Sequence, residues 1–300
     1  MSAPLPWRTW VPEFVLLAML WGSSFLFMRE GAYAFGPFST AWVRVSLAAC
    51  MLTPVLLWRQ QWPDLKAHWQ HSLMSGLLNA GIPFACYSYA LLHLSTGLSS
   101  ILNATTPLFG ALVARLWLGE RLSRTRALGL GLGFGGVALL ASHVSGDLSF
   151  QPEGMGLAMV ACLLATLCYG IAGSYTQRFL KGVPAMVTST GSLWGASLGL
   201  MVPGLLYWPS HYIPLRAWAA LGIAGFFCTA LAYVLYFRLM AKTGPARAMT
   251  VTYLIPVFAN LIGVVFLDEI VTLWMLGCAA LIVLGTALAS GLISGPSTKL

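Results

Sequence analysis

Polar side chains recur at helical spacing inside three of the most apolar stretches of this sequence. In residues 97–118, Ser99, Asn103, Thr106 and Gly110 follow one another at spacings of 4, 3 and 4 residues, which places them on one face of a helix. Similar stripes are formed by Ser75, Asn79 and Pro83, continued by Cys86 or Tyr87, and by Thr250, Tyr253, Val257 and Asn260. An asparagine in hydrocarbon is costly unless it pairs across helices or lines a wet cavity, so the stripes predict one of these two arrangements. Three stripes together favour a cavity.

Aromatic residues also lie in the middle of apolar stretches. Such rings can stack an apolar or aromatic solute or hold a cation, and they can equally serve as packing. Trp21 and Tyr169 are favoured as part of a pathway because they occupy matching positions of a repeat described below. The candidate cavity residues, which include Ser24 beside Trp21, are therefore Trp21, Ser24, Asn79, Tyr87, Ser99, Asn103, Thr106, Tyr169, Trp194, Tyr253 and Asn260.

Two prolines within apolar stretches are candidate hinges. Pro107 and Pro256 lack a backbone N–H and free the carbonyls four residues earlier, those of Asn103 and Thr252. In a membrane such breaks persist where the carbonyl is otherwise satisfied or faces a water-filled cavity. The two prolines therefore predict paired hinges beside a cavity, with a plain structural kink as the alternative.

Enzymatic and metal chemistry are not indicated. Gly195-Ala196-Ser197-Leu198-Gly199 formally matches the serine-hydrolase elbow, but that motif requires a strand–turn–helix context and no His or acid lies at a matching depth. The six cysteines all fall within apolar stretches without metal-ligand spacing, and the five histidines are scattered. We expect no enzymatic activity, no bound metal and no cofactor.

The composition identifies the class of protein that carries these residues. Of 300 residues, 58% are hydrophobic and 8% charged, against about 25% charged in an average soluble domain. Charges this few cannot cover a soluble globule, which excludes a cytosolic enzyme, a nucleic-acid binder and a disordered chain. The formal net charge of +8 is therefore assigned to loops at the membrane surface and not to a nucleic-acid-binding patch. The sequence predicts an integral membrane protein whose partners are a small-molecule substrate and the lipid bilayer, with no nucleic acid.

The elements that must position the polar residues are transmembrane helices. A helix needs about 20 mostly apolar residues to cross the hydrocarbon. Long unbroken apolar runs such as Leu276–Leu284 lack the alternation of a β-barrel, so an all-α membrane fold is predicted. The ten expected spans are 11–29, 38–57, 71–92, 97–118, 127–144, 155–176, 185–207, 215–239, 247–267 and 271–292.

The distribution of basic residues predicts the orientation. With the N-terminus in the cytoplasm, thirteen of the 16 Lys and Arg residues fall on the cytoplasmic side, only Arg29 and Arg216 lie outside, and Arg44 lies within a span. Most tryptophans lie near span ends, where the headgroup region favours them. We therefore expect a multi-pass protein of the cell inner (plasma) membrane with both termini cytoplasmic.

An internal repeat with reversed charge runs through the sequence. A shift of 149 residues brings Tyr87, Pro107, Glu120 and Gly136 onto Tyr236, Pro256, Glu269 and Gly285, and a shift of 148 brings Trp21-Gly22 onto Tyr169-Gly170. The basic residues of one copy match uncharged residues of the other, so equivalent loops are expected on opposite sides of the membrane. This pattern predicts two five-helix repeats, residues 1–146 and 147–300, in inverted orientation, an architecture of transporters whose substrate site lies near the midplane.

Several short motifs resemble a known family along essentially the whole chain. They are Trp21-Gly22-Ser23-Ser24-Phe25, Gly36-Pro37 followed by Arg44, Asn103-Ala104-Thr105-Thr106-Pro107, Leu118-Gly119-Glu120-Arg121-Leu122, Tyr253-Leu254-Ile255-Pro256 and Phe266-Leu267-Asp268-Glu269. Their order and spacing resemble the EamA family of the drug/metabolite transporter superfamily, and within it the YddG-type exporters of aromatic and other amino acids. The resemblance implies ten helices in two inverted repeats and, for Arg44, a structural role in pairing with nearby polar or backbone groups.

The charges within the spans narrow the predicted solute. Glu13 lies at the cytoplasmic edge of the first span, whereas small multidrug-resistance relatives place an essential glutamate deep in that helix. Arg44 is the only basic residue available to a phosphate. The predicted function is an inner-membrane transporter that exports or facilitates movement of neutral amino acids by alternating access. The alternatives are a proton-coupled multidrug or cation antiporter, and a channel or scaffold without a transport cycle.

Overall fold

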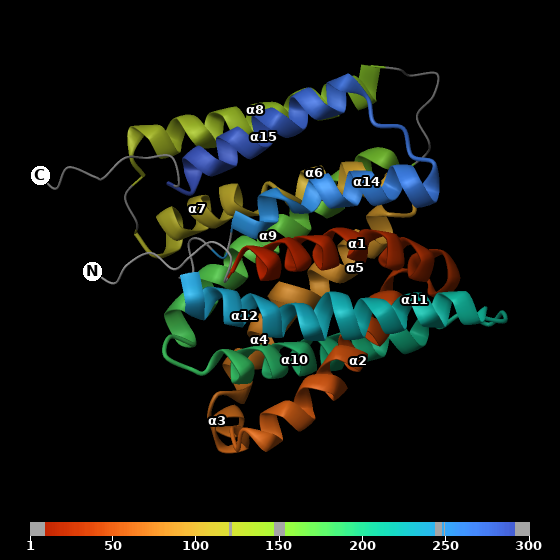
Figure 1. Cartoon of the computed structure of the whole chain (residues 1–300), viewed down its shortest axis with the longest axis vertical. Coiled ribbons are helices and arrows are strands. Elements are labelled where there is room, and N and C mark those ends of the chain that lie inside the picture. Colours follow the sequence, from red (N-terminus) through yellow and green to blue (C-terminus); the bar gives the residue numbers. More distant parts are fainter. Residues whose placement is uncertain (1–9, 120–121, 147–153, 244–247, 249, 292–300) are drawn as a thin grey trace, which may run out of the picture.

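The computed structural model describes residues 10–119, 122–146, 154–243, 248 and 250–291, and within them every regular element is a helix. Helices in the first half are α1 Val11–Phe35, α2 Pro37–Trp58, α3 Trp62–Ala67, α4 Trp69–Gly76, η2 Leu77–Gly81, α5 Ile82–Ala90, α6 Thr96–Asn103, α7 Thr106–Trp117 and α8 Arg124–Gly146. Those in the second half are α9 Met155–Phe179, α10 Ala185–Leu206, α11 Leu215–Gly225, η3 Phe226–Leu231, α12 Ala232–Thr243, η4 Thr250–Tyr253, α14 Ile255–Leu267 and α15 Leu273–Ala289. Figure 1 shows most of them side by side in one bundle.

Seven helical segments are long and apolar enough to cross a membrane, by length and composition. They are Val11–Phe35, Pro37–Trp58, Thr96–Trp117, Arg124–Ser142, Met155–Phe179, Leu215–Tyr236 and Thr250–Leu267. Leu273–Ala289 is a shorter apolar helix. Each of the ten predicted spans contains helical residues, but this criterion gives fewer than ten, and the count of ten stays a prediction.

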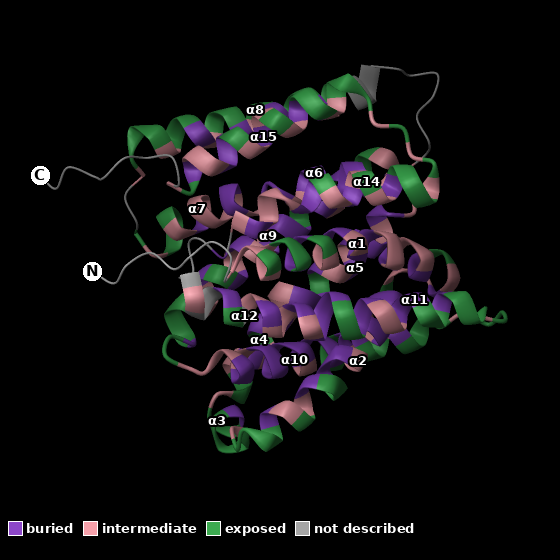
Figure 2. Ribbon diagram, in the orientation of Figure 1, coloured by how far each residue is buried: buried purple, intermediate pink, exposed green. Residues whose placement is uncertain are grey.

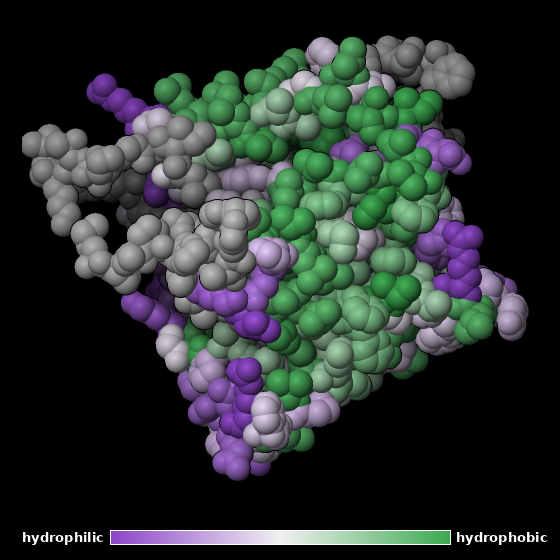
Figure 3. Space-filling model, in the orientation of Figure 1, coloured by the Kyte–Doolittle hydropathy of each residue, from purple (hydrophilic) through white to green (hydrophobic). Residues whose placement is uncertain are grey.

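Large apolar side chains cover the outside of the bundle. Figure 3 shows them across the middle of one face, with hydrophilic residues gathered toward its two ends. In Figure 2 the exposed residues follow the outward sides of helices such as α8, and buried residues line the sides that face other helices. Leu128, Val160, Val202 and Val265 are among the exposed apolar residues. Such a surface is matched to lipid, where lipid tails replace water as the solvent.

Helix interruptions recur at the offset found in the sequence. A π-helix begins at Leu77 and another at Phe226, 149 residues later. The break before α7, which begins at Thr106, is matched by the break before α14, which begins at Ile255. The fifth long helix of each half, beginning at Arg124 and Leu273, keeps the same offset. A π-helix is rare, so two at equivalent positions are strong structural support for the repeat. Glu120, whose match with Glu269 helped to find the repeat, lies outside the described residues.

Equivalent helices of the two halves pack antiparallel. Near one end of α2, Ser39 Oγ donates to the Gly204 carbonyl of α10, and Ser46 Oγ lies 2.7 Å from Ser197 Oγ further along. Between α8 and α15, a Cβ added at Gly129 would touch the backbone of Ala289, and one added at Gly136 would touch that of Ile282. In both pairs the residue number rises on one helix while it falls on the other. The two copies are therefore inverted relative to each other at these contacts.

Candidate functional site

Two pairs of aromatic rings related by the repeat lie in the interior of the bundle. Trp21 of α1 and Tyr236 of α12 have ring centroids 5.5 Å apart, and Tyr87 of α5 and Tyr169 of α9 have centroids 6.4 Å apart. Trp21 occupies the position of Tyr169, and Tyr236 the position of Tyr87, in the other half. Each pair joins a helix of one repeat to a helix of the other. The pairs therefore mark equivalent points on the contact between the two halves.

The glycines that follow Trp21 and Tyr169 fix the position of these rings. An added Cβ at Gly22 would lie 2.6 Å from Phe258 Cβ, and one at Gly170 would lie 2.8 Å from the carbonyl carbon of Phe109. Phe109 and Phe258 are themselves equivalent in the repeat. Without a Cβ, α1 approaches α14 and α9 approaches α7 closely, as small residues allow in membrane helices. The matching Trp-Gly and Tyr-Gly pairs of the sequence thus form matching contacts.

Asn103 lies at the break between α6 and α7, next to Tyr87. Its Oδ1 accepts a hydrogen bond from the Tyr87 hydroxyl at 3.0 Å. Its carbonyl, freed by Pro107, accepts one from Thr106 Oγ1 at 2.8 Å. Asn103 Nδ2 makes no hydrogen bond with any residue that the structure describes. The side chain of Asn103 is therefore partly an interhelical bridge, and its part in a substrate pathway stays a prediction.

Asn79 occupies the π-helix η2 and contacts a residue that the sequence did not single out. Its Nδ2 donates to the Tyr233 hydroxyl of α12 at 3.3 Å. Asn79 Oδ1, among the described residues, has no donor. The position of Tyr233 could have been found from the repeat, because it is equivalent to Phe84 and lies three residues before Tyr236, the equivalent of Tyr87.

Arg44 is buried at the contact between the two halves, with 3% of its surface exposed. Its Nε donates to Thr229 Oγ1 of η3 at 2.9 Å, and Nη1 lies 2.9 Å from the sulfur of Met28. The guanidinium carbon lies 4.1 Å from the centre of the Phe84 ring. Tyr169 and Tyr233 are close enough to interact with it electrostatically. We call Arg44 with Asn79, Tyr87, Asn103, Tyr169 and Tyr233 the central cluster.

Three further candidates, Ser24, Ser99 and Trp194, lie outside the central cluster. Ser24 donates to the Trp21 carbonyl of its own helix, and Ser99 is fully buried. Trp194 of α10 donates to Thr53 of α2 at 2.9 Å. These are the packing roles that the sequence left open. Their part in a pathway stays a prediction.

The candidate residues of the ninth predicted span make their hydrogen bonds outside the central cluster. The Tyr253 hydroxyl pairs with Ser290 Oγ at 3.0 Å, at the end of α15. Asn260 Nδ2 donates to the Pro256 carbonyl at 2.7 Å, and its side chain packs where a Cβ on Gly97 would lie. Pro256 opens α14, as Pro107 opens α7. The two prolines are equivalent helix starts after a break, and whether they act as hinges stays a prediction.

Ionic clusters lie toward the two ends of α1. Near its start, Glu13 contacts Lys242 and Arg238 at 2.8 and 2.9 Å. Sixteen residues later, about 24 Å along the helix axis, Arg29 contacts Glu269 at 2.6 Å. Glu269 Oε1, which makes this contact, also accepts a hydrogen bond from Thr96 N, and Oε2 accepts from Thr96 Oγ1 and Gly97 N at the start of α6. We call this group, Arg29 with Glu269 and the start of α6, the Glu269 latch.

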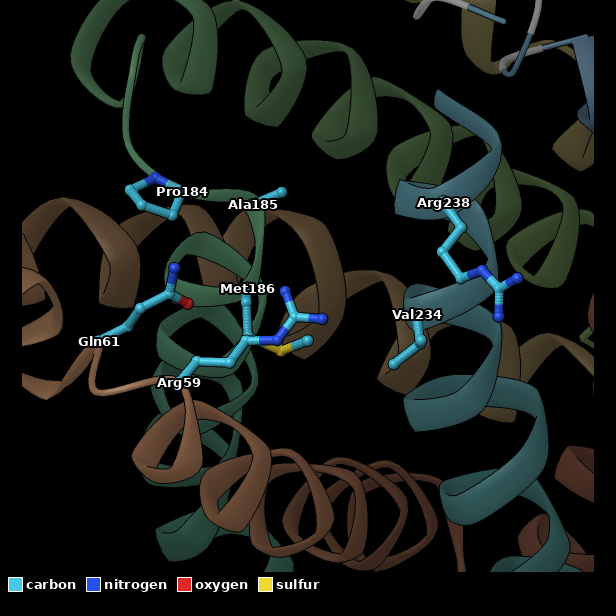
Figure 4. Close-up of a pocket in the computed structure, with 7 residues that line it drawn as sticks. All are labelled: Arg59, Gln61, Pro184, Ala185, Met186, Val234 and Arg238. Atoms are coloured by element: carbon cyan, nitrogen blue, oxygen red, sulfur yellow. The ribbon is translucent and has the colours of Figure 1, made fainter. Parts of the chain in front are cut away.

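An opening lies at the Glu13 end of the bundle. It has a volume of about 230 Å³ and is lined by Arg59, Gln61, Pro184, Ala185, Met186, Val234 and Arg238. Figure 4 shows these side chains projecting from the end of α2, the start of α10 and α12 around a hollow. Val234 precedes Arg238 by one turn of α12, and no residue of the central cluster lines the opening. Two arginines make its rim basic.

In the part of the chain that the structure describes, no group of three or more His, Cys, Asp or Glu side chains comes together. The six cysteines are all free thiols.

The comparison with known families settles the class of protein. The model of the EamA-like transporter family matches this chain twice, over residues 9–142 and 156–291. The chain belongs to the EamA-like transporter family. It is a membrane protein of a transporter family, and each match covers one copy of the repeat seen in the helices.

Curated relatives share this family over most of their length. The uncharacterized transporter YvbV of Bacillus subtilis is 25% identical over 91% of this chain and 89% of its own. The uncharacterized inner membrane transporter YedA of Escherichia coli K12 is 26% identical over 82% of this chain and 79% of its own. Protein LicB of Haemophilus influenzae is 24% identical, over 83% and 86%. A solved crystal structure with 22% identity superposes with a TM-score of 0.64 over 95% of this chain and 97% of that chain, which shows the shared fold.

Proposed function

We propose that this chain is an inner-membrane transporter that exports or facilitates the movement of amino acids, aromatic and other neutral ones included, by alternating access. The observation that carries the proposal is the pair of repeat-related ring contacts, Trp21–Tyr236 and Tyr87–Tyr169, placed where the halves meet. Inverted-repeat transporters bind their substrates near the midplane at this contact. Aromatic faces there suit an apolar side chain.

The polar groups of the central cluster complement a zwitterion. Asn103 Nδ2 offers hydrogen-bond donors to a carboxylate, and Asn79 Oδ1 offers an acceptor to an ammonium group. Neither atom is engaged by a described residue. A neutral amino acid presents both charges and an apolar side chain, and so matches the cluster in three respects.

The proposed topology has ten spans, in repeats 1–146 and 147–300, with both termini in the cytoplasm. This orientation places Arg59 and Arg238 on the cytoplasmic side, as the excess of basic residues in cytoplasmic loops favours. The opening between them then faces the cytoplasm, and the Glu269 latch closes the outer end. YedA is named as an inner membrane transporter, which supports the same location for this chain.

Counterflow in proteoliposomes tests the transport mechanism. Because a carrier returns faster when loaded, unlabelled amino acid inside the vesicles is expected to accelerate uptake of the labelled amino acid severalfold. Linear, unsaturable flux would instead favour the channel. Glu13→Gln separates the antiporter alternative: Glu13 is held by Arg238 and Lys242, so the variant is expected to retain counterflow. Uptake that depends strictly on a pH gradient and disappears in Glu13→Gln would support proton coupling instead.

Cysteine labelling tests the inverted topology. In a background without the six native cysteines, Ser123→Cys is expected to react with an impermeant maleimide only from the cytoplasm. Val271→Cys, at the equivalent end of the other repeat, is expected to react only from outside. The opposite orientation of the repeats requires this difference, because the two residues precede equivalent helices, α8 and α15. Labelling of both cysteines from one face would contradict the topology and the site between the repeats.

A further inference from the structure

We propose that Arg44 binds the carboxylate of the transported substrate, so that the transporter selects carboxylate-bearing solutes over the corresponding amides and amines. The inference rests on the proposed function and names the group that would decide its specificity. It changes the role of Arg44 from the structural pairing that the sequence predicted to direct contact with the solute.

The charge of Arg44 is incompletely paired. The side chain is 97% buried, yet no described carboxylate contacts it. Glu13, Glu30 and Glu269 each pair with other basic residues. An ionised group buried in a membrane protein without a counter-charge is costly, and such groups mark substrate pathways. A carboxylate supplied by the substrate would complete the pair.

The hydrogen-bonding capacity of the Arg44 guanidinium is only partly used. Nε is engaged by Thr229, but Nη1 faces the Met28 sulfur, which is a weak acceptor. Nη2 has no hydrogen-bond partner among the residues described. The two Nη atoms thus present a fork that an incoming carboxylate can satisfy with two parallel bonds, the geometry for which arginine is suited.

Arg44 lies at the contact between the two repeats and has no basic equivalent in the second one. It bridges α2 of the first half to η3 of the second, beside Phe84, Tyr169 and Tyr233. Its equivalent 148 residues later is Ser192, which is uncharged. Arg44 therefore has no charged counterpart in the second half, which fits one carboxylate per transporter. Arg59, at the rim of the opening, would attract the same charge.

Competition assays test this assignment. The probes are labelled L-phenylalanine for counterflow, 3-phenylpropionate as a carboxylate without the amine, and L-phenylalaninamide as an amine without the carboxylate. In the wild type, phenylpropionate is expected to compete at least tenfold better than the amide. In Arg44→Gln its half-inhibitory concentration is expected to rise about tenfold to a hundredfold, as for loss of a charged hydrogen bond, while that of the amide changes less than twofold. For Arg44→Lys, which keeps the charge but not the two parallel N–H groups, the half-inhibitory concentration of phenylpropionate is expected to lie between those of the wild type and Arg44→Gln. Arg216→Gln, an exposed arginine of the outer surface, is the matched control and is expected to match the wild type.

Thermal shift on the purified protein gives a second readout that needs no transport. Phenylpropionate is expected to raise the melting temperature of the wild type and of Arg216→Gln, but not of Arg44→Gln. If Arg44→Gln does not fold, the competition assay is made with the wild type and Arg44→Lys alone. Equal competition by phenylalaninamide and phenylpropionate in both proteins would overturn the proposal. Equal stabilisation by sodium chloride would assign the guanidinium to inorganic anions and would also overturn it. Absence of phenylalanine counterflow in the wild type counts against the proposed function instead, and leaves the thermal shift to decide on Arg44.

Discussion

Asn103→Ala is expected to weaken amino-acid transport by about tenfold to a hundredfold while it lowers the melting temperature only slightly. The lost interaction would be a hydrogen bond from Nδ2 to the substrate's carboxylate, worth roughly 1.5–3 kcal/mol for a charged partner. Stability changes less, because the bond that Asn103 makes within the protein joins it to a neutral Tyr87 hydroxyl. Hydrogen bonds between membrane helices average only about 0.6 kcal/mol.

Tyr87→Phe is the matched control for this prediction. It removes the same hydrogen bond within the protein but leaves the Asn103 amide in place, so its effect on the apparent affinity should be smaller, within a few-fold. Counterflow and detergent-solubilised melting temperature would be measured on the same preparations of both variants. If both variants transport normally and melt at lower temperatures, Asn103 is a bridge between α5 and α6 and not part of the pathway.

The fold was predictable because membrane helices and repeats leave strong signals in sequence. Apolar length predicted helices, and the 149-residue offset matched Pro107 with Pro256, which the structure places in the first turns of α7 and α14. These signals are local. A proline favours a helix start, and a long apolar run favours a membrane helix, whatever the distant contacts of the chain are. The family and its membrane location followed from the same features.

The polar stripes were predicted less well, since helical spacing assumes an unbroken helix. The π-helix η2 inserts extra residues per turn between Ser75 and Pro83, which rotates the face. Ser75 consequently contacts Thr176 of α9, whereas Asn79 contacts Tyr233 of α12. In the fourth predicted span the break before α7 separates Ser99 from Thr106 in the same way. A period of 3.6 residues cannot reveal such interruptions.

The residues that contact Arg44 could not be predicted from the sequence either. Thr229, Met28 and Phe84 come from three separate helices, and only their packing brings them to one guanidinium. The repeat offered one signal, because Phe84 and Tyr233 are equivalent residues beside the same cation. Tertiary contacts of this kind depend on helix rotation, which is set by neighbouring helices and not by composition.

Glu269→Ala is expected to lower the stability of its end of the bundle more than any change at the Glu13 cluster lowers that of the other end. The Glu269 side chain is 8% exposed and accepts bonds from Arg29, Thr96 and Gly97, so its removal leaves the start of α6 and a partly buried cation without their acceptor. Breaking such a pair by removing one partner costs about 3–5 kcal/mol when both charges are buried. Arg29 is 26% exposed and can recruit water, which places the expected loss near the lower end of that range.

The position of the Glu269 latch at one end of the bundle predicts an effect on access to the transport pathway. It joins α1, α6 and the segment after α14 at the end opposite the basic opening. The proposed orientation places this end outside, so loss of the latch is expected to raise the population of conformers open to the outside. In a background without native cysteines, Ser95→Cys, at the start of α6, is expected to react at least several times faster with an external maleimide in Glu269→Ala. Glu30→Ala, which loses only the exposed pair with Arg216, is the matched control and should leave that rate unchanged. An unchanged labelling rate in Glu269→Ala, together with a lowered melting temperature, would show that the latch stabilises the fold without controlling access.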